Sequence, residues 1–360
     1  MIDYPDYLRL LPKVELHCHF VATIRPATLV ELARAHEVPL PSYDLDELFG
    51  YDNIVDFLTV FEAANQVFVD QGVFERVAYE SVEDAVTAGN LRYREYFVNA
   101  HLFPISYAQV LDGMVAGLRA AEREFGVGFG IIPAIARFQR PEDAVALVRT
   151  MLDDGRPEVL GLGQDYLTAE NTEAPELWTD AYALAARHGL RRTAHVAEIP
   201  GSTADAVTVA IRELDCARLD HGYHVLDDPA VVEVARELQI PFTCTPYSTQ
   251  VLSGWAMTPD HPVAQMIRAG LNVTLSTDDP TFFRTDIGRE YAEALPAMGF
   301  GPDVARRIAL AGVEAAWCAP EQKERLRAGF TAQIRALDAR LDHASVASVI
   351  GSPVGADRAD

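Results

Sequence analysis

The chain alternates between short apolar segments and longer amphipathic ones along most of its length. The apolar segments are rich in β-branched and aromatic residues, as buried strands are. They cover residues 13–20, 91–99, 129–137, 158–165, 190–196, 217–221, 241–245 and 271–276. Most of the stretches between them are rich in alanine and carry apolar residues at helical spacing, such as 107–126, which closes on Gly126. Strands that alternate with helices pair in parallel through right-handed crossovers.

Eight such units predict a (β/α)₈ barrel, the TIM-barrel fold, in a single domain over residues 1–343. An open doubly wound sheet is the alternative, but no GxGxxG turn follows the first strand. The stretch from about 40 to 88 is helical and too long for a simple loop, so it predicts a helical lid inserted after the first strand. The small, polar residues 344–360 are predicted to be a disordered tail.

Composition narrows the classes of partner. The 360 residues carry a formal net charge of -23, which argues against nucleic acid or an anionic membrane and favours a small-molecule substrate. The four cysteines form no CxxC pair, so neither a disulfide framework nor a thiolate zinc site is expected. No apolar run reaches the length of a membrane span and no signal sequence is apparent, which predicts a cytoplasmic protein. The oligomeric state stays open.

The segment "KVELHCHF" near the start of the chain places two histidines one residue apart in a predicted strand. Side chains i and i+2 of a strand point the same way, so His17 and His19 lie side by side. Two neighbouring imidazoles gain little from this arrangement unless a metal ion lies between them. The segment therefore predicts half of a metal site.

Other reactive side chains fall where later predicted strands end. The fifth strand ends at His195 with Glu198 three residues on, the sixth ends at His221, and the eighth is followed by Asp278 and Asp279. In a (β/α)₈ barrel the carboxyl ends of all strands meet at one mouth, where the chemistry takes place. These residues, distant in sequence, are therefore expected at one site.

Three imidazoles and one carboxylate suit Zn²⁺. The predicted ligands are His17, His19, His195 and Asp278. One position stays open for a water, whose pKa zinc lowers toward neutrality. Amidohydrolases with two metals commonly bridge them with a carboxylated lysine at mid-barrel. The two lysines, Lys13 and Lys323, do not fall at such a position, so we predict one zinc ion per chain.

The catalytic assignments follow from residue type. His221 and Asp278 are predicted to orient the water and take its proton, and Glu198 to deliver a proton to the substrate. Asp279 is free to accept a hydrogen bond from a substrate N–H group.

At these residues the sequence resembles the adenosine deaminase family of the amidohydrolase superfamily, from about Leu11 to Tyr291. "PKVELHCHF" is similar to the family's PKxELHxHL opening and "TAHVAE" to its HAGE segment. "RLDHGYHVLDD" resembles RxGHGxxxxxD, and "LSTDDP" matches the closing S/NTDDP. The HxE and PCxxC motifs of cytidine deaminases do not occur.

The resemblance implies the same four zinc ligands and hydrolytic deamination of a 6-aminopurine nucleoside, such as adenosine, to the 6-oxopurine and ammonia. It implies that Glu198 protonates N1 while the activated water attacks C6. It also implies that His221 orients that water and Asp279 hydrogen-bonds N7. Adenine, 6-aminodeoxyfutalosine and N6-modified adenines are alternative substrates. A binding protein that has lost catalysis is the alternative of another class.

The departures from the family lie on the substrate side. Val21 replaces an acid that follows the paired histidines, and Ala197 replaces the glycine of HAGE. An apolar Val21 would leave a buried 5′-hydroxyl unpaired, which predicts a nucleoside with an apolar or substituted 5′ position. Substrate contacts are predicted for His19, Val21, Gln164, Asp165 and Asp279.

Overall fold

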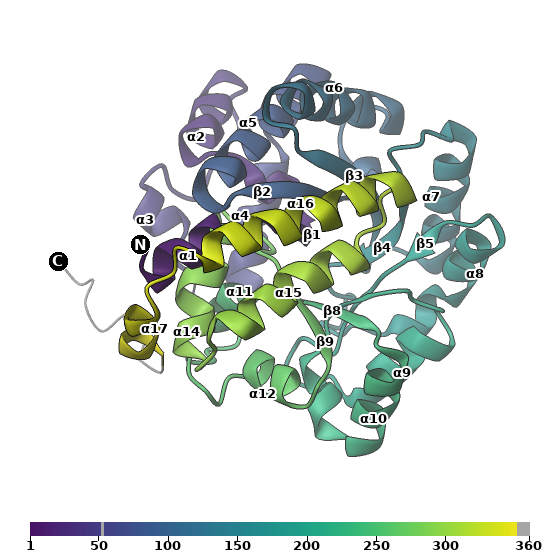
Figure 1. Cartoon of the computed structure of the whole chain (residues 1–360). Helices are drawn as coiled ribbons and strands as arrows, with labels where there is room; N and C mark the ends of the chain where they lie inside the picture. Colours follow the sequence, from purple (N-terminus) through teal and green to yellow (C-terminus); the bar gives the residue numbers. More distant parts are fainter. Residues whose placement is uncertain (52–53, 351–360) are drawn as a thin grey trace.

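The centre of the molecule is a barrel of parallel strands with helices around it, so the predicted (β/α)₈ fold is confirmed (Figure 1). A computed structural model describes the whole chain except residues 52–53 and 351–360. The strands are β1 Lys13–His19, β2 Leu91–Val98, β3 Gly128–Ala136, β4 Gly161–Asp165, β5 Arg191–Arg192, β6 His195–Val196, β7 Leu219–His221, β8 Pro241–Cys244 and β9 Asn272–Leu275.

The strands pair in two runs, β1 to β5 and β6 to β9, which join into one barrel. The segment expected as a single strand over 190–196 is split into two. Its first part, β5, pairs with β4, and its last part, β6, pairs with β7. The Thr193 amide donates to the Leu162 carbonyl at 3.0 Å. The two runs also meet where β1 lies beside the segment that follows β9, and we call this junction the seam. There the His19 amide donates to the Asp278 carbonyl at 2.8 Å.

Along the chain, each strand of the barrel is followed by an outer helix, when β5 and β6 are taken as one strand. These helices are α5 Gln71–Gly89, α6 Tyr107–Phe125, α7 Pro141–Asp154, α8 Thr179–Arg187, α9 Ala204–Arg212, α10 Pro229–Leu238, α12 Pro262–Arg268 and α15 Pro302–Ala315. The predicted helix at 107–126 is confirmed as α6, which ends at Gly126 with φ 70°. Gly117 allows α5 and α6 to pack closely, because a Cβ at this position would lie only 2.1 Å from the Glu75 carbonyl oxygen.

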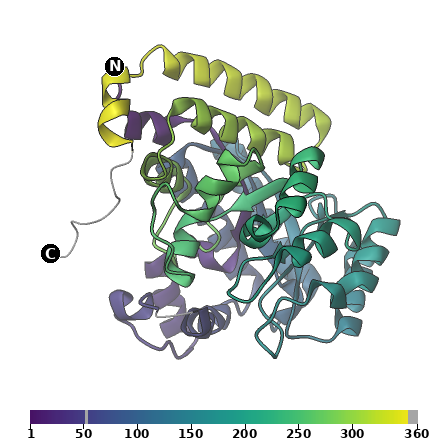
Figure 2. The same cartoon turned by 90° about the horizontal axis from the view of Figure 1, so that it is seen from below.

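The chain between β1 and α5 is helical, as expected for the region of the predicted lid. It contains the turn η1 Val21–Thr23 and the helices α2 Pro26–Ala35, α3 Leu45–Leu48 and α4 Ile54–Asn65. Helix α4 places Phe57, Leu58 and Phe61 over the barrel mouth. This region lies at the opposite end of the molecule from α15 and α16 Pro320–Asp338 (Figure 2). The extent of the lid, residues 40–88, stays a prediction. Helix α5 falls within this range and packs against α6 and β2 on the outside of the barrel.

The remaining helices are short. They are α1 Tyr4–Leu10, α11 Pro246–Leu252, α13 Ile287–Arg289, α14 Leu295–Ala297 and α17 His343–Val349. Helix α17 corrects the expectation that disorder begins at 344. It is capped by Asp342, and the Tyr4 amide donates to the Ser345 hydroxyl at 2.9 Å. The rest of the expected tail, 351–360, lies outside the described residues. None of the described helices combines the length and apolar composition that crossing a bilayer requires.

Candidate active site

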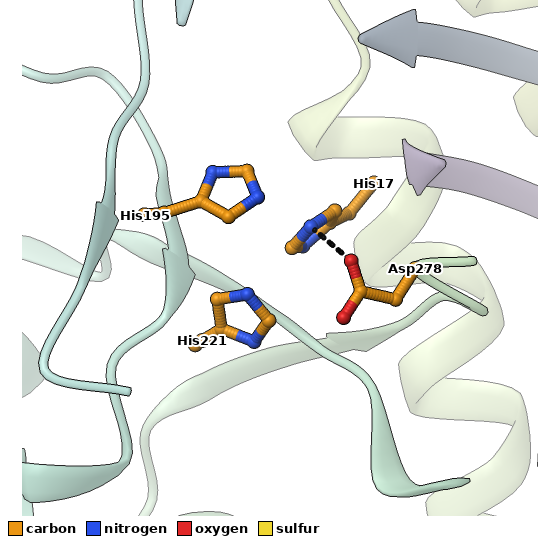
Figure 3. Close-up of side chains that lie close together, drawn as sticks. All are labelled: His17, His195, His221 and Asp278. Atoms are coloured by element: carbon orange, nitrogen blue, oxygen red, sulfur yellow. Dashed lines mark ion pairs between the residues drawn. The ribbon is translucent and has the colours of Figure 1, made fainter. Parts of the chain in front are cut away.

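Four of the predicted residues meet at the carboxyl ends of the strands. His17 at β1, His195 at β6, His221 at β7 and Asp278 after β9 are buried, and their donor atoms lie within 4.8 Å of one another. The three imidazoles and the carboxylate face a common space (Figure 3). The sequence prediction that these strand ends share one site agrees with this arrangement.

His19 joins the same cluster. Its Nε2 lies 3.1 Å from His195 Nε2 and 3.3 Å from Asp278 Oδ1, and His17 Nε2 lies 3.0 Å from the same oxygen. Bonds of about 2.0–2.1 Å to a tetrahedral Zn²⁺ would place neighbouring ligand atoms about 3.4 Å apart. These three separations come close to that spacing. His17, His195 and Asp278 also belong to the group whose donor atoms all lie within 4.8 Å, which contains His221 in place of His19, whereas His19 groups with Asp278 and Asp279.

A buried carboxylate that sequence reasoning missed lies behind two of the imidazoles, nearer to His195 than to His17, whose Nδ1 is hydrogen-bonded to Thr243. Asp220 Oδ2 lies 3.5 Å from His195 Nδ1, and its Oδ1 lies 4.0 Å from His17 Nδ1. The hydroxyls of Thr193 and Thr243 donate to Asp220 at 2.7 Å each. A carboxylate behind a metal-binding imidazole fixes its orientation and tautomer.

The backbone explains why Asp220 was missed. Alternation along a strand predicts that Asp220 and His221 point to opposite faces. His221 has φ 64°, in the left-handed region, so the chain turns at the end of β7 and both side chains reach the site. The position of Asp220 beside a motif histidine was the only hint available in the sequence.

Asp278 is held on two sides. The Ser248 hydroxyl donates to Asp278 Oδ2 at 2.6 Å. Glu15 of β1 accepts hydrogen bonds from the Thr277 amide at 2.9 Å and from its hydroxyl at 2.6 Å, which fixes the backbone just before Asp278. Asp278 itself has φ 63°. Neither Ser248 nor Glu15 was predicted to support the site.

Two further acids face the cluster from the cavity side. Glu198 Oε2 lies 3.5 Å from His221 Nε2. Burial and the neighbouring Asp278 and Glu173 carboxylates raise the pKa of Glu198. Asp279 Oδ1 is buried with no hydrogen-bond partner among the described residues, and burial together with Asp278 raises the pKa of its carboxyl well above the usual range. Both shifts favour the protonated form of the acid.

The site opens into a cavity of about 500 Å³, counted with its opening to solvent. His19, Asp165 and Asp279, all predicted to contact substrate, line this cavity. Asp165 accepts a hydrogen bond from Asn99 Nδ2 at 2.7 Å. Its other oxygen lies 3.6 Å from His19 Nδ1, so Asp165 also pairs with one of the clustered histidines.

The structure does not place the other two predicted substrate contacts on the cavity wall. Gln164 precedes Asp165 in β4, so its side chain leaves the opposite face of the strand, where it is fully buried. Val21 lies in the turn η1 and packs in the hydrophobic core.

The outer part of the cavity is apolar. Its lining includes Phe57, Leu58 and Phe61 of α4, together with Leu167 and Leu252. A periodic apolar face is usual in a packed helix, so the sequence alone did not mark the α4 side chains as cavity residues.

Arg137, at the end of β3, also lines the cavity and was missed. Its Nε donates to the Tyr166 carbonyl at 2.6 Å and its Nη1 to the His195 carbonyl at 2.7 Å. The guanidinium therefore joins the ends of three strands and adds a positive charge beside the buried acids.

A parallel barrel with histidines and an aspartate clustered at its mouth, beside a buried carboxylic acid, defines a metal-dependent hydrolase of the amidohydrolase superfamily. The chain belongs to the adenosine deaminase family, whose model, described as adenosine deaminase, matches residues 12–333. The family's enzymes are hydrolytic deaminases that act on C–N bonds.

Individual proteins agree with this assignment. The chain is 29% identical to an adenine deaminase of Gibberella zeae, over 89% of this chain and 94% of the relative. It is 30% identical to an adenosine deaminase of Shigella flexneri, over 88% of this chain and 97% of the relative. A solved amidohydrolase of Burkholderia ambifaria with bound Zn is 31% identical, with a TM-score of 0.85 and coverage of 96% of this chain and 94% of that one.

Proposed function

We propose that this protein removes the 6-amino group of a 6-aminopurine by hydrolysis. One observation carries the proposal. Glu198, His221 and Asp279 line the same cavity as the clustered histidines and aspartate. In the reaction the water oxygen forms a bond to C6, the C6–N bond breaks, and ammonia leaves. One proton of the water goes to the departing amino group, and the proton of the new C6 hydroxyl replaces the one that Glu198 gives to N1.

We propose that His17, His19, His195 and Asp278 hold one zinc ion. The short separations among these four side chains and the zinc in the Burkholderia ambifaria structure support this set. His221 also lies within reach of the cluster, but its Nε2 faces Glu198, so we assign it to the reacting water. When bound, the zinc lowers the pKa of a water molecule and so supplies the nucleophile.

The protein side chains then move and hold protons. Glu198 keeps its proton because its pKa is raised, and it donates that proton to ring N1, which makes C6 more electrophilic. His221 orients the water, and His221 and Asp278 take its proton. Asp279 recognises N7. A nucleoside N7 is an acceptor, and the raised pKa of Asp279 suits donation to it. The proposed role therefore differs from the acceptor role that the sequence predicts for Asp279.

The support that Asp220 gives to His17 and His195 leads to a prediction. Asp220→Asn leaves a similar shape but cannot stabilise both imidazoles, so zinc affinity should fall about 10- to 100-fold. Competition with a chromogenic chelator measures this affinity. Asp153→Asn, at an exposed aspartate of α7, is the matched control and should bind zinc like the wild type. An unchanged affinity in Asp220→Asn would contradict the proposed support of the ligand imidazoles by Asp220.

The extent of the substrate beyond the purine depends on the apolar outer cavity. A ribose hydroxyl buried against Phe57, Phe61 and Leu252 would lose its hydrogen bonds to water at a cost of about 1–3 kcal/mol. We therefore propose a nucleoside whose 5′ position is apolar or substituted. The argument rests on this lining rather than on Val21, which packs in the core. Adenine is the second candidate, because it carries no sugar to bury and several of the relatives are adenine deaminases.

A panel of substrates tests this proposal. We expect kcat/KM for 5′-deoxyadenosine and 5′-methylthioadenosine to equal or exceed that for adenosine, measured by ammonia release with zinc-replete protein. Adenine and N6-methyladenine complete the panel. If adenosine exceeds both 5′-altered nucleosides tenfold or more, a polar group binds the 5′-hydroxyl and the substrate proposal fails. No turnover of any amine would favour a binding protein that has lost catalysis.

A further inference from the structure

The backbone that carries Glu198 is held by a second glutamate. Glu173 Oε2 accepts a hydrogen bond from the Ala197 amide at 2.6 Å, and its Oε1 accepts from the amides of Glu198 at 2.7 Å and Ile199 at 3.2 Å. The Glu173 side chain comes from the loop after β4 and is only 3% exposed. Three successive amides that point at one carboxylate form an anion-binding nest.

This nest holds a residue with an uncommon backbone conformation. Ala197 has φ 53°, in the left-handed region, which costs a residue with a Cβ about 1 kcal/mol or more. Glycine would adopt this conformation without that cost. The hydrogen bonds from Glu173 favour the conformation and so offset the cost of the alanine.

We propose that Glu173 is a positioning residue that fixes Glu198 for proton donation, so the inference rests on the proposed function. The Ala197–Ile199 amides define where the Glu198 side chain leaves the backbone, and with it the 3.5 Å approach of Glu198 to His221. Glu173 is neither one of the proposed metal ligands nor part of the cavity lining. It acts on Glu198 in two ways: its charge raises the pKa of Glu198, and its hydrogen bonds fix the backbone of residues 197–199. The positioning proposed here is the second of these.

The same loop forms part of the cavity wall. Tyr166 and Leu167, seven and six residues before Glu173, line the cavity. The loop between them is closed by the Thr168 amide donating to the Thr172 carbonyl at 2.9 Å.

The first test is Glu173→Gln. The glutamine side chain has one acceptor oxygen and one NH₂ group, so at least one of the three backbone N–H groups faces another donor and loses its hydrogen bond. We expect kcat to fall about 10- to 100-fold, because a misplacement near 1 Å costs about this much. KM and bound zinc should stay within about twofold of the wild-type values. Hydrogen exchange followed by mass spectrometry should show faster exchange of the 197–199 amides. Glu176→Gln, at an exposed glutamate of the same segment, should leave all of these quantities unchanged.

The second test separates positioning from general stabilisation. Adding Ala197→Gly to Glu173→Gln removes the conformational cost of the turn, so kcat should recover at least threefold while the amides still exchange faster. If Glu173→Gln does not fold, Glu173→Asp with and without Ala197→Gly gives the same comparison. Wild-type kcat in a folded Glu173 variant, or no recovery on adding glycine, would overturn the proposal.

The exchange measurement also separates this inference from the proposed function. If the wild-type protein deaminates no purine, the function proposal fails. Slow exchange of the 197–199 amides that depends on Glu173 would still demonstrate the nest. If exchange is the same with and without the Glu173 carboxylate, the nest itself is absent and the inference fails on its own.

Discussion

Glu198→Gln should yield a folded protein that binds zinc like the wild type and deaminates about 10²- to 10⁴-fold more slowly. The glutamine side chain keeps the shape of Glu198 but has no acidic proton for ring N1. Because Glu198 faces His221 and the cavity rather than the predicted zinc ligands, the metal should stay in place. Ammonia release gives kcat, and metal analysis of the same sample gives the zinc content.

Glu213→Gln is the control for this experiment, since Glu213 is exposed at the end of α9. It should match the wild type in both measurements. Zinc loss in Glu198→Gln equal to that of a ligand variant would show that Glu198 is a ligand, and the division of roles would be wrong.

His195→Ala and Asp278→Ala should each lose most of the bound zinc and nearly all activity. Each change removes one of four close ligand atoms, so the remaining three hold the ion more weakly. Zinc that binds only the folded protein stabilises it by about 4 kcal/mol when present at 1,000 times its Kd. Wild-type Tm should therefore rise on adding zinc, and the rise should be much smaller in either variant.

Thermal unfolding with added zinc or with a chelator measures this difference. His36→Ala, at an exposed histidine after α2, should keep the full zinc-dependent rise. If His195→Ala keeps stoichiometric zinc and the full rise in Tm, the ligand set proposed here is wrong.

The fold and the reactive side chains could be predicted because their patterns are local in the sequence. Each strand is a short apolar run. His17 and His195 lie near the ends of such runs, and Asp278 follows one. Parallel pairing then brings every carboxyl end to one mouth, so no knowledge of side-chain packing was needed. Residues at the ends of separate strands therefore form one cluster once the barrel closes.

The supporting residues could not be predicted because they depend on backbone turns and long-range packing. The left-handed conformation at His221 brings Asp220 into the site against the usual alternation. Glu173 acts on amides 24 to 26 residues away, through hydrogen bonds that no spacing rule describes. Val21 was assigned to substrate by its position in a motif, although the turn η1 directs it into the core.

The seam between β1 and the segment after β9 has a consequence for how the protein is made. His17 and His19 are synthesised about 260 residues before Asp278. At translation rates of about 5–20 residues per second, the early histidines wait roughly 10 to 50 s for the carboxylate. Until then β1 lacks its neighbour at the seam and has an unpaired edge that other chains could join. With the ligand set proposed above, full ligation of the metal would coincide with closure of the barrel, and the ion would bind tightly only to chains that have completed the fold.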